Sequence, residues 1–246
     1  MVDSKQLSAR ARARQAPPKD SFRLGEQLCA HPDDGAAADE RAPWDIGRVQ
    51  PAVIEWDREG TIRGDVLDAG CGFGENAAFL ASRGHRVTGV DSSPEAIDRA
   101  RELMRERGLD VTFTIADLTE LSGCDGRFET VVDSALFHCL DQEERSRYLR
   151  ALHRATAPGA HLHLLCFSDA LPRGNPELFR IGARELRDSL KAEGWESCEL
   201  RRGTLLGCVP SDELREIYLR RFSPDGGADA YGVVHSPAWW ARARRV

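Results

Sequence analysis

Residues 66–76 read VLDAGCGFGEN, in which Gly70, Gly72 and Gly74 follow a short apolar run. A chain brings glycines this close together where its backbone must turn tightly, or where it approaches a ligand at a point where a Cβ would clash. The residues after the loop predict a helix that Gly84 ends. Strand, glycine turn and helix together place a ligand at a helix N-terminus on the carboxyl edge of a sheet.

The spacing of the loop discriminates between ligands. A dinucleotide fingerprint counted from Gly70 and Gly72 requires a third glycine where the chain has Glu75. A P-loop also fails, because no Gly-Lys-Ser/Thr follows. A glutamate at the start of the helix carries the wrong charge for a pyrophosphate. It suits a ligand that has no phosphate and carries positive groups.

Two further acids lie at predicted strand ends. Asp91 ends the second strand, 21 residues after Gly70, and is placed to accept hydrogen bonds from two ribose hydroxyls. The third strand ends in Ala116, Asp117 and Leu118, where a carboxylate can take an adenine amino group. A ribose acid, an adenine acid and the lack of a phosphate site together describe S-adenosylmethionine.

Strands alternate with helices along the chain, which predicts a doubly wound parallel sheet in an α/β fold. Ser93 is the expected N-cap of the second helix, with Pro94 at its first position and Gly108 at its end. The predicted strands are 65–69, 86–91, 111–116, 128–136, 160–168 and 198–209, and the predicted helices are 76–84, 93–109, 141–156, 183–195 and 211–222.

Two prolines carry separate expectations. Pro51 opens a helix whose buried side is expected to hold Val53, Ile54 and Trp56. Pro237 lies in a β-like run near the C-terminus, and it predicts that this run is an edge strand or begins after the proline.

At this point the chain resembles a class I S-adenosylmethionine-dependent methyltransferase, through VLDAGCGFGEN, VTGVDSSPEAI, IADL and VVDSALFH in this order. The segments PWDIGRVQPAVIE, DSALFHCL, LHLLCFSD and AWWARARR are similar, more narrowly, to the thiopurine S-methyltransferase-like group and its bacterial members that methylate quinones and heterocycles. The resemblance implies a seven-stranded, mostly parallel sheet with a C-terminal antiparallel strand.

The resemblance also implies where S-adenosylmethionine binds. In the narrower group the Trp-Asp segment folds over the cofactor, which carries to Trp44, Asp45 and Arg48. The full set of expected cofactor contacts is Trp44, Asp68, Gly70, Cys71, Gly72, Gly74, Asn76, Asp91, Ser92, Ala116, Asp117, Leu118, Asp133, Ser134 and Ala135.

The expected acceptor is a small, flat, apolar molecule that is methylated on an aromatic hydroxyl, with a thiol or a ring nitrogen as the next choices. Candidate substrate contacts are Phe137, His138, Phe167 and Tyr218, with residues 171–222 partly forming a cap. His138 follows the fourth strand and is the candidate general base, because a phenol must lose a proton and titrates near 10. Its alternative role is a core or capping histidine. Methyltransferases that act on nucleic-acid bases resemble one another in carrying Asn/Asp-Pro-Pro-Tyr/Phe, and this chain has Asp-Ser-Ala-Leu-Phe instead.

Composition bounds the remaining alternatives. The 246 residues fit one domain, 41–246, behind an N-terminal arm, 1–40, expected to be disordered or loosely ordered. Residues 1–19 carry a net charge of +4 and the remainder −10, which disfavours a nucleic-acid partner.

No apolar run suits a membrane span or a signal peptide, so a cytoplasmic monomer or homodimer is expected. The seven cysteines form no CxxC pair and are expected to be buried thiols. His161 and His163 lack an identifiable third ligand, so no metal site is expected. Two rival functions stay open, an NAD-dependent oxidoreductase and a regulatory protein that binds S-adenosylmethionine without turnover.

Overall fold

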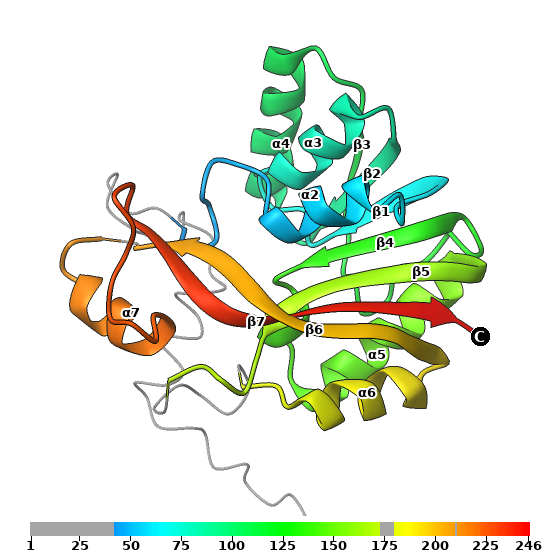
Figure 1. Ribbon diagram of the computed structural model, residues 1–246. Coiled ribbons are helices and arrows are strands. Elements are labelled where there is room, and N and C mark those ends of the chain that lie inside the picture. Colours follow the sequence, from blue (N-terminus) through cyan, green and yellow to red (C-terminus); the bar gives the residue numbers. More distant parts are fainter. Residues whose placement is uncertain (1–41, 173–179, 210) are drawn as a thin grey trace, which may run out of the picture.

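A computed structural model of the chain describes residues 42–172, 180–209 and 211–246 (Figure 1). The described strands form one seven-stranded sheet in the order β3-β2-β1-β4-β5-β7-β6. Strands β1 to β5 run parallel, and β7 pairs antiparallel with both β5 and β6. This confirms the predicted fold class. The predicted arm, residues 1–40, lies outside the described residues. The strands are β1 Asp65–Ala69, β2 Arg86–Asp91, β3 Thr112–Ile115, β4 Phe128–Ser134, β5 Thr156–Phe167, β6 Trp195–Cys208 and β7 Val233–Arg245.

Helices cover both faces of the sheet because successive strand residues point to opposite sides. Val66 belongs to the core shared with α2, α3, α4 and α7, whereas its neighbour Leu67 belongs to the core shared with α5 and α6. Figure 1 shows α5 and α6 together along one side of the sheet. The helices are α2 Pro51–Arg58, α3 Glu75–Ser82, α4 Pro94–Arg107, the 3₁₀ turn η1 Phe137–Cys139, α5 Gln142–Ala155, α6 Ala183–Ala192 and α7 Arg215–Phe222.

The sequence signals at helix ends act locally, as expected. The Ser93 hydroxyl accepts a hydrogen bond from the Ala96 amide at 3.2 Å, and Gly108 ends α4 in the left-handed conformation. The expectation for α2 is wrong at one residue. Val53 and Trp56 are buried, but Ile54 is 37% exposed, because the buried stripe of this helix runs through 52, 53 and 56.

Pro237 does not mark an edge strand, and this prediction is wrong. It lies inside β7, which has β5 on one side and β6 on the other. The ladder with β5 ends at Ala238, and the Pro237 carbonyl accepts from the Ser168 amide at 3.0 Å. The N–H that proline lacks would point to that same side, just beyond the end of β5. The missing donor therefore affects only this last pairing, and the ladder from Ala238 onward is intact.

The first residues of β7 consequently pair only with β6. The two strands continue past the end of β5 as a ribbon that reaches toward α7 (Figure 1). Cys71, Cys166 and Cys208 are buried as expected, whereas Cys198 is exposed on β6. No helix in the described part of the chain is long and apolar enough to cross a membrane.

Candidate functional site

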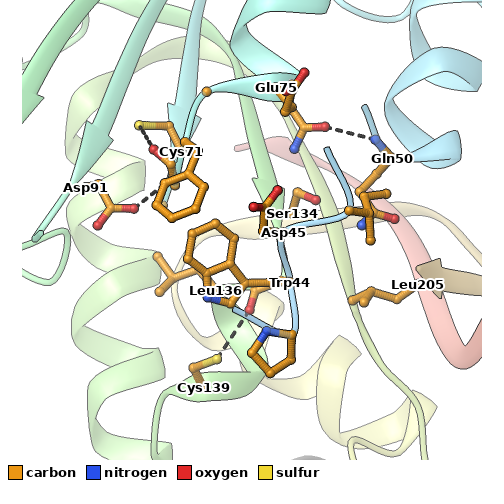
Figure 2. Close-up of a pocket in the computed structure, with 18 of the residues that line it drawn as sticks. Trp44, Asp45, Gln50, Cys71, Glu75, Asp91, Ser134, Leu136, Cys139 and Leu205 are labelled. Carbon is orange, nitrogen blue, oxygen red and sulfur yellow. Dashed lines mark hydrogen bonds between the residues drawn. The ribbon is translucent and has the colours of Figure 1, made fainter. Parts of the chain in front are cut away.

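A cavity lies at the carboxyl ends of β1, β2 and β4, which is where an open parallel sheet binds ligands. Its floor is the glycine loop, and Asp91 and Ser134 mark the ends of the neighbouring strands (Figure 2). The lining residues are Pro43, Trp44, Asp45, Ile46, Arg48, Gln50, Gly70, Cys71, Gly72, Phe73, Gly74, Glu75, Asn76, Asp91, Ser92, Ser134, Ala135, Leu136, His138, Cys139, Phe167, Leu205 and Tyr218.

The glycine loop needs glycine for both conformation and space. Gly70, Gly72 and Gly74 have φ of +72°, +52° and +87°, a region that other L-residues adopt only with strain. A Cβ at Gly72 would lie 2.9 Å from the Trp44 ring, and one at Gly70 would lie 3.0 Å from the Leu136 Cβ. The loop backbone can therefore be approached closely by a flat group.

Asp91 holds the loop while facing the cavity. One carboxylate oxygen accepts from the Gly72 amide at 2.9 Å, and the other accepts from the Ser93 amide at 3.0 Å. A carboxylate oxygen has two acceptor positions, so both can also accept from a diol. The geometry fits the ribose-binding role expected for Asp91.

Asp68 is a buried acid directly before the loop. Neither of its oxygens has a hydrogen-bond partner among the described residues. Burial, and then the carboxyls of Asp91 and Asp133, raise the pKa of Asp68 to about 7. Asp68 does not line the cavity, but its carboxyl is buried beneath the loop and its negative charge when ionised favours a ligand with positive charge, so the residues present fit S-adenosylmethionine.

Asp133 supports the turn that follows β4 rather than lining the cavity. Its carboxylate accepts from the Tyr148 hydroxyl at 2.9 Å and from the Leu136 amide at 2.9 Å. Burial raises the pKa of Asp133 to about 7, although these bonds favour the charged form. The next turn residue, Ala135, has φ of +84°, a strained conformation that costs of order 1–3 kcal/mol.

The segment 42–50, here called the strap, precedes α2 in the chain and lines one side of the cavity. The Cys208 amide donates to the Pro43 carbonyl at 2.8 Å. The Gln50 side chain donates to the Leu206 carbonyl at 2.8 Å and accepts from the Leu206 amide at 3.0 Å. These bonds fasten the strap to β6.

Trp44 is the strap residue that reaches over the glycine loop. Its ring lies 4.5 Å from the Phe73 ring, edge to face. Figure 2 shows the Trp44 ring next to Leu136 and a dashed bond that joins the strap at Gln50 to the chain at the start of α3. That bond runs from the Gln50 amide to the Asn76 side-chain oxygen at 3.1 Å.

An aromatic wall, formed by His138, Phe167 and Tyr218, lines the same cavity as the glycine loop. The His138 ring lies 4.1 Å from the Phe167 ring, and Phe222 lies 5.4 Å from Phe167 and 4.7 Å from Tyr218. His138 is 5% exposed, and its Nδ1 accepts from the Phe167 amide at 3.4 Å. Burial, and then the charge of Arg145, lower the pKa of His138 to about 3. The general-base role of His138 stays a prediction.

Phe137 is not part of this wall, which corrects one expected substrate contact. It is fully buried in the core on the α5 side of the sheet, with the Arg145 guanidinium 5.0 Å from its ring centre. Successive residues of a 3₁₀ turn point about 120° apart. The turn η1 therefore directs Phe137 into the core while His138 and Cys139 line the cavity.

Three expected adenine contacts lie outside the cavity lining. Leu118 is buried in the core, and Asp117 is exposed. Both the Thr119 hydroxyl and its amide donate to one Asp117 oxygen at 2.8 Å, and these bonds lower the pKa of Asp117. The roles of Ala116, Asp117 and Leu118 stay predictions.

Several lining residues were not anticipated from the sequence. Leu136 and Cys139 could have been found from their place directly after the fourth strand. Gln50 and Leu205 carry no local signal, because their place depends on the pairing of the strap with β6. The unanticipated lining residues are Pro43, Ile46, Gln50, Phe73, Leu136, Cys139 and Leu205.

Residues 171–222 contribute to the cavity through Leu205 and Tyr218. The described part of this range contains α6, β6 and α7. The substrate cap stays a prediction. The rings of His161 and His163 are 6.3 Å apart, and His163 packs against Trp56 at 5.0 Å. Within the described ranges no group of three or more His, Cys, Asp or Glu residues is arranged to hold a metal ion.

Comparison with protein families adds independent findings. The family described as "Methyltransferase domain" matches residues 66–159, which contain the glycine loop, Asp91 and the turn after β4. The 2-heptyl-1-hydroxyquinolin-4(1H)-one methyltransferase of Mycobacteroides abscessus is 44% identical over 166 residues, which cover 63% of this chain and 69% of that protein.

Solved structures show the same arrangement. One, from work on the conversion of a disulfide bond into a thioacetal group during echinomycin biosynthesis, has a TM-score of 0.71 and 37% identity, and covers 83% of this chain and 85% of that one. The Burkholderia thailandensis 1,6-didemethyltoxoflavin-N1-methyltransferase, with bound 1,6-didemethyltoxoflavin and S-adenosylhomocysteine, has a TM-score of 0.56 and 23% identity, and covers 80% and 77%. The second likeness is one of fold alone.

Proposed function

We propose a reaction for this protein from one premise: the chain belongs to the class I S-adenosylmethionine-dependent methyltransferases. It is an enzyme that uses S-adenosylmethionine to methylate a small molecule. The acceptor we propose is a small, flat aromatic molecule that is methylated on a hydroxyl, with a thiol or a ring nitrogen as the next choices. Within the family, the strap and its Trp44 favour the thiopurine S-methyltransferase-like group.

The observation that carries this proposal is the aromatic wall of His138, Phe167 and Tyr218 in one cavity with the glycine loop. Flat rings recognise a flat ring by stacking. The Mycobacteroides relative, named for a hydroxylated bicyclic quinolone, supports an acceptor of this shape. The compound in that relative's name carries its hydroxyl on the ring nitrogen, and we extend this chemistry to the present chain.

The residues that would hold S-adenosylmethionine are the glycine loop, Asp91, Asp68 and Trp44. When bound, it supplies a methyl group on a sulfonium that is already activated for displacement. Asp91 would bind the ribose, while Trp44 and the strap would cover the cofactor and exclude water.

The chain's contribution to the reaction is alignment. The acceptor oxygen uses a lone pair to form the new C–O bond, and the C–S bond breaks with its electron pair left on sulfur. No covalent nucleophile is required. Cys71 does not suit that role in any case, because burial raises the pKa of its thiol.

The test has a binding arm and a turnover arm. Calorimetry measures the binding of S-adenosylmethionine and S-adenosylhomocysteine. A methylation assay, with products identified by mass spectrometry, measures turnover of N-hydroxyquinolones, naphthols, thiophenols and N-heterocycles. We expect one cofactor per chain and fastest turnover of a hydroxyl acceptor. Methylation of thiols or ring nitrogens alone would contradict the proposed atom.

A matched pair of variants ties binding to the loop. Gly72→Ala adds a Cβ at 2.9 Å from the Trp44 ring, and Gly123→Ala adds one in open space, both at positive φ. Both variants suffer comparable backbone strain, but only the first borders the cavity. We expect Gly72→Ala to weaken cofactor binding at least about tenfold, a change of about 1.4 kcal/mol, and Gly123→Ala to bind like the wild type. Equal effects would mean that strain alone is responsible.

A further inference from the structure

The turn η1 holds the His138 ring in one orientation. The Arg145 side chain donates to the Phe137 carbonyl at 3.1 Å, and it also pairs with Glu185 of α6 at 3.1 Å. The ring itself packs on Phe167, and the Phe167 amide donates to its Nδ1. Contacts from α5, α6 and β5 therefore fix both the backbone and the ring of this residue.

The Phe167 amide also determines which ring nitrogen carries the proton. A backbone N–H donates and never accepts, so the Nδ1 atom that faces it must present a lone pair. A neutral imidazole with a lone pair on Nδ1 carries its proton on Nε2. Because burial and Arg145 lower the pKa of His138 to about 3, the ring stays neutral across the physiological range.

We propose that His138 acts on the acceptor as a hydrogen-bond donor through Nε2–H, and not as the base that removes its proton. The acceptor then enters as an oxyanion, which selects acidic hydroxyl compounds such as N-hydroxy heterocycles and electron-poor phenols. This inference rests on the proposed function and narrows its substrate class.

The carboxylates that line the cavity are engaged in other contacts. Asp91 accepts from two loop amides, Glu75 pairs with Arg107 at 3.0 Å, and Asp45 accepts from the Gly47 amide at 3.0 Å. The charged group that acts on His138 is Arg145 from α5, and the titratable side chains of Cys139 and Tyr218 line the same cavity. Burial raises the pKa of both Tyr218 and Cys166.

The proton balance follows from this assignment. The acceptor loses its proton to water before the transfer step. Its oxyanion lone pair then forms the C–O bond as the C–S bond breaks onto sulfur, so the products are a methyl ether and a neutral thioether. His138 keeps its Nε2 proton throughout and orients the oxygen.

The first test is the pH dependence of kcat/KM for the wild type at saturating cofactor, across a series of N-hydroxyquinolones, nitrophenols and naphthols of different acidity. We expect kcat/KM to rise with pH to a plateau, with a midpoint at each acceptor's own pKa. This midpoint should be about 10 for an unactivated phenol and lower for more acidic acceptors. If His138 were the base, kcat/KM would instead fall as the pH passes the acceptor's pKa, because the neutral acceptor would be the substrate.

The second test compares His138→Gln with His138→Leu. Glutamine retains an amide N–H near Nε2 and cannot act as a base, whereas leucine removes the donor. We expect His138→Leu to lose roughly 10- to 100-fold in kcat/KM, as for a lost hydrogen bond to a charged group, and His138→Gln to recover most of that loss. Melting temperature and cofactor affinity, which should match the wild type, control for folding.

The outcomes separate this inference from the proposed function. The donor role alone would be overturned if the wild type turned over and both His138 variants lost activity equally. It would also be overturned if the wild-type kcat/KM fell as the pH rose through the acceptor's pKa. A wild type that binds the cofactor and methylates no hydroxyl compound would overturn the acceptor assignment together with this inference. The wild-type pH profiles decide the question even where a variant does not fold.

Discussion

At the scale of single residues, Asp91 connects the fold to the site. Its carboxylate fixes Gly72 and Ser93 through two amides, and it lines the cavity at the end of β2. One side chain therefore shapes the glycine loop, and we propose that it also accepts hydrogen bonds from the cofactor's ribose. Loss of this carboxylate should affect binding before it affects the rest of the sheet.

Asp91→Ala should weaken S-adenosylmethionine binding by roughly 1.5–3 kcal/mol for each charged hydrogen bond lost. Calorimetry at neutral pH measures this directly. The matched control is Asp110→Ala, which removes an exposed carboxyl between α4 and β3. An Asp91→Ala protein with unchanged affinity would contradict the ribose-binding role.

At the scale of elements, the strap closes one side of the site. It has no regular secondary structure of its own along 42–50, so its place depends on bonds to β6 and α3. Gln50 supplies three of these bonds, because its side-chain amide pairs with both backbone groups of Leu206 and its backbone N–H donates to Asn76. A strap held in this way can open without disturbing the sheet.

Gln50→Ala should loosen the strap, because it leaves the buried Leu206 amide and carbonyl without their side-chain partner, at a cost of about 1–3 kcal/mol. We expect faster proteolysis near Gly47 and weaker cofactor binding. Cofactor should slow cleavage in the wild type and less so in the variant.

The control for this experiment is Gln142→Ala, which changes an exposed glutamine on α5. It should behave like the wild type in both measurements. Cleavage near Gly47 that is equally fast with and without cofactor in the wild type would contradict closure of the strap over the cofactor.

At the scale of the whole molecule, two buried acids near the carboxyl ends of β1 and β4 influence the stability of the fold. Asp68 and Asp133 lie at the ends of the adjacent strands β1 and β4, and the pKa of each is raised to about 7. A raised pKa means that the folded chain binds more protons than the unfolded chain between about pH 4 and pH 7. These acids therefore stabilise the fold least when both are ionised.

The free energy of unfolding contributed by Asp68 should be fully present below its unfolded pKa, near 3.8, and should be lost as the pH rises through about 7. Asp68→Asn removes the titrating group, so it should flatten this part of the stability curve and gain stability relative to the wild type at pH 8. Chemical denaturation without cofactor at several pH values measures the difference, with the exposed Asp98→Asn as control. A parallel shift of the Asp68→Asn and wild-type curves would contradict the assignment.

Local sequence determined most of the fold and the glycine-loop side of the cavity. Some signals act within a few residues, so they can be predicted without a structure. They are the glycines at 70, 72 and 74, the helix cap at Ser93 and the alternation of strands with helices. Asp91 is legible for the same reason, because the carboxyl ends of parallel strands meet at one edge whatever the details of packing.

Only the tertiary structure decided the aromatic wall and the position of the strap. Gln50 and Leu206 are 156 positions apart, and no periodicity reports their pairing. The burial of Phe137, the interior place of Pro237 and the amide that fixes the His138 ring each depend on which distant strand lies alongside. Sequence patterns show which side of an element is apolar and where the element ends, but packing of the whole chain decides which partner covers it.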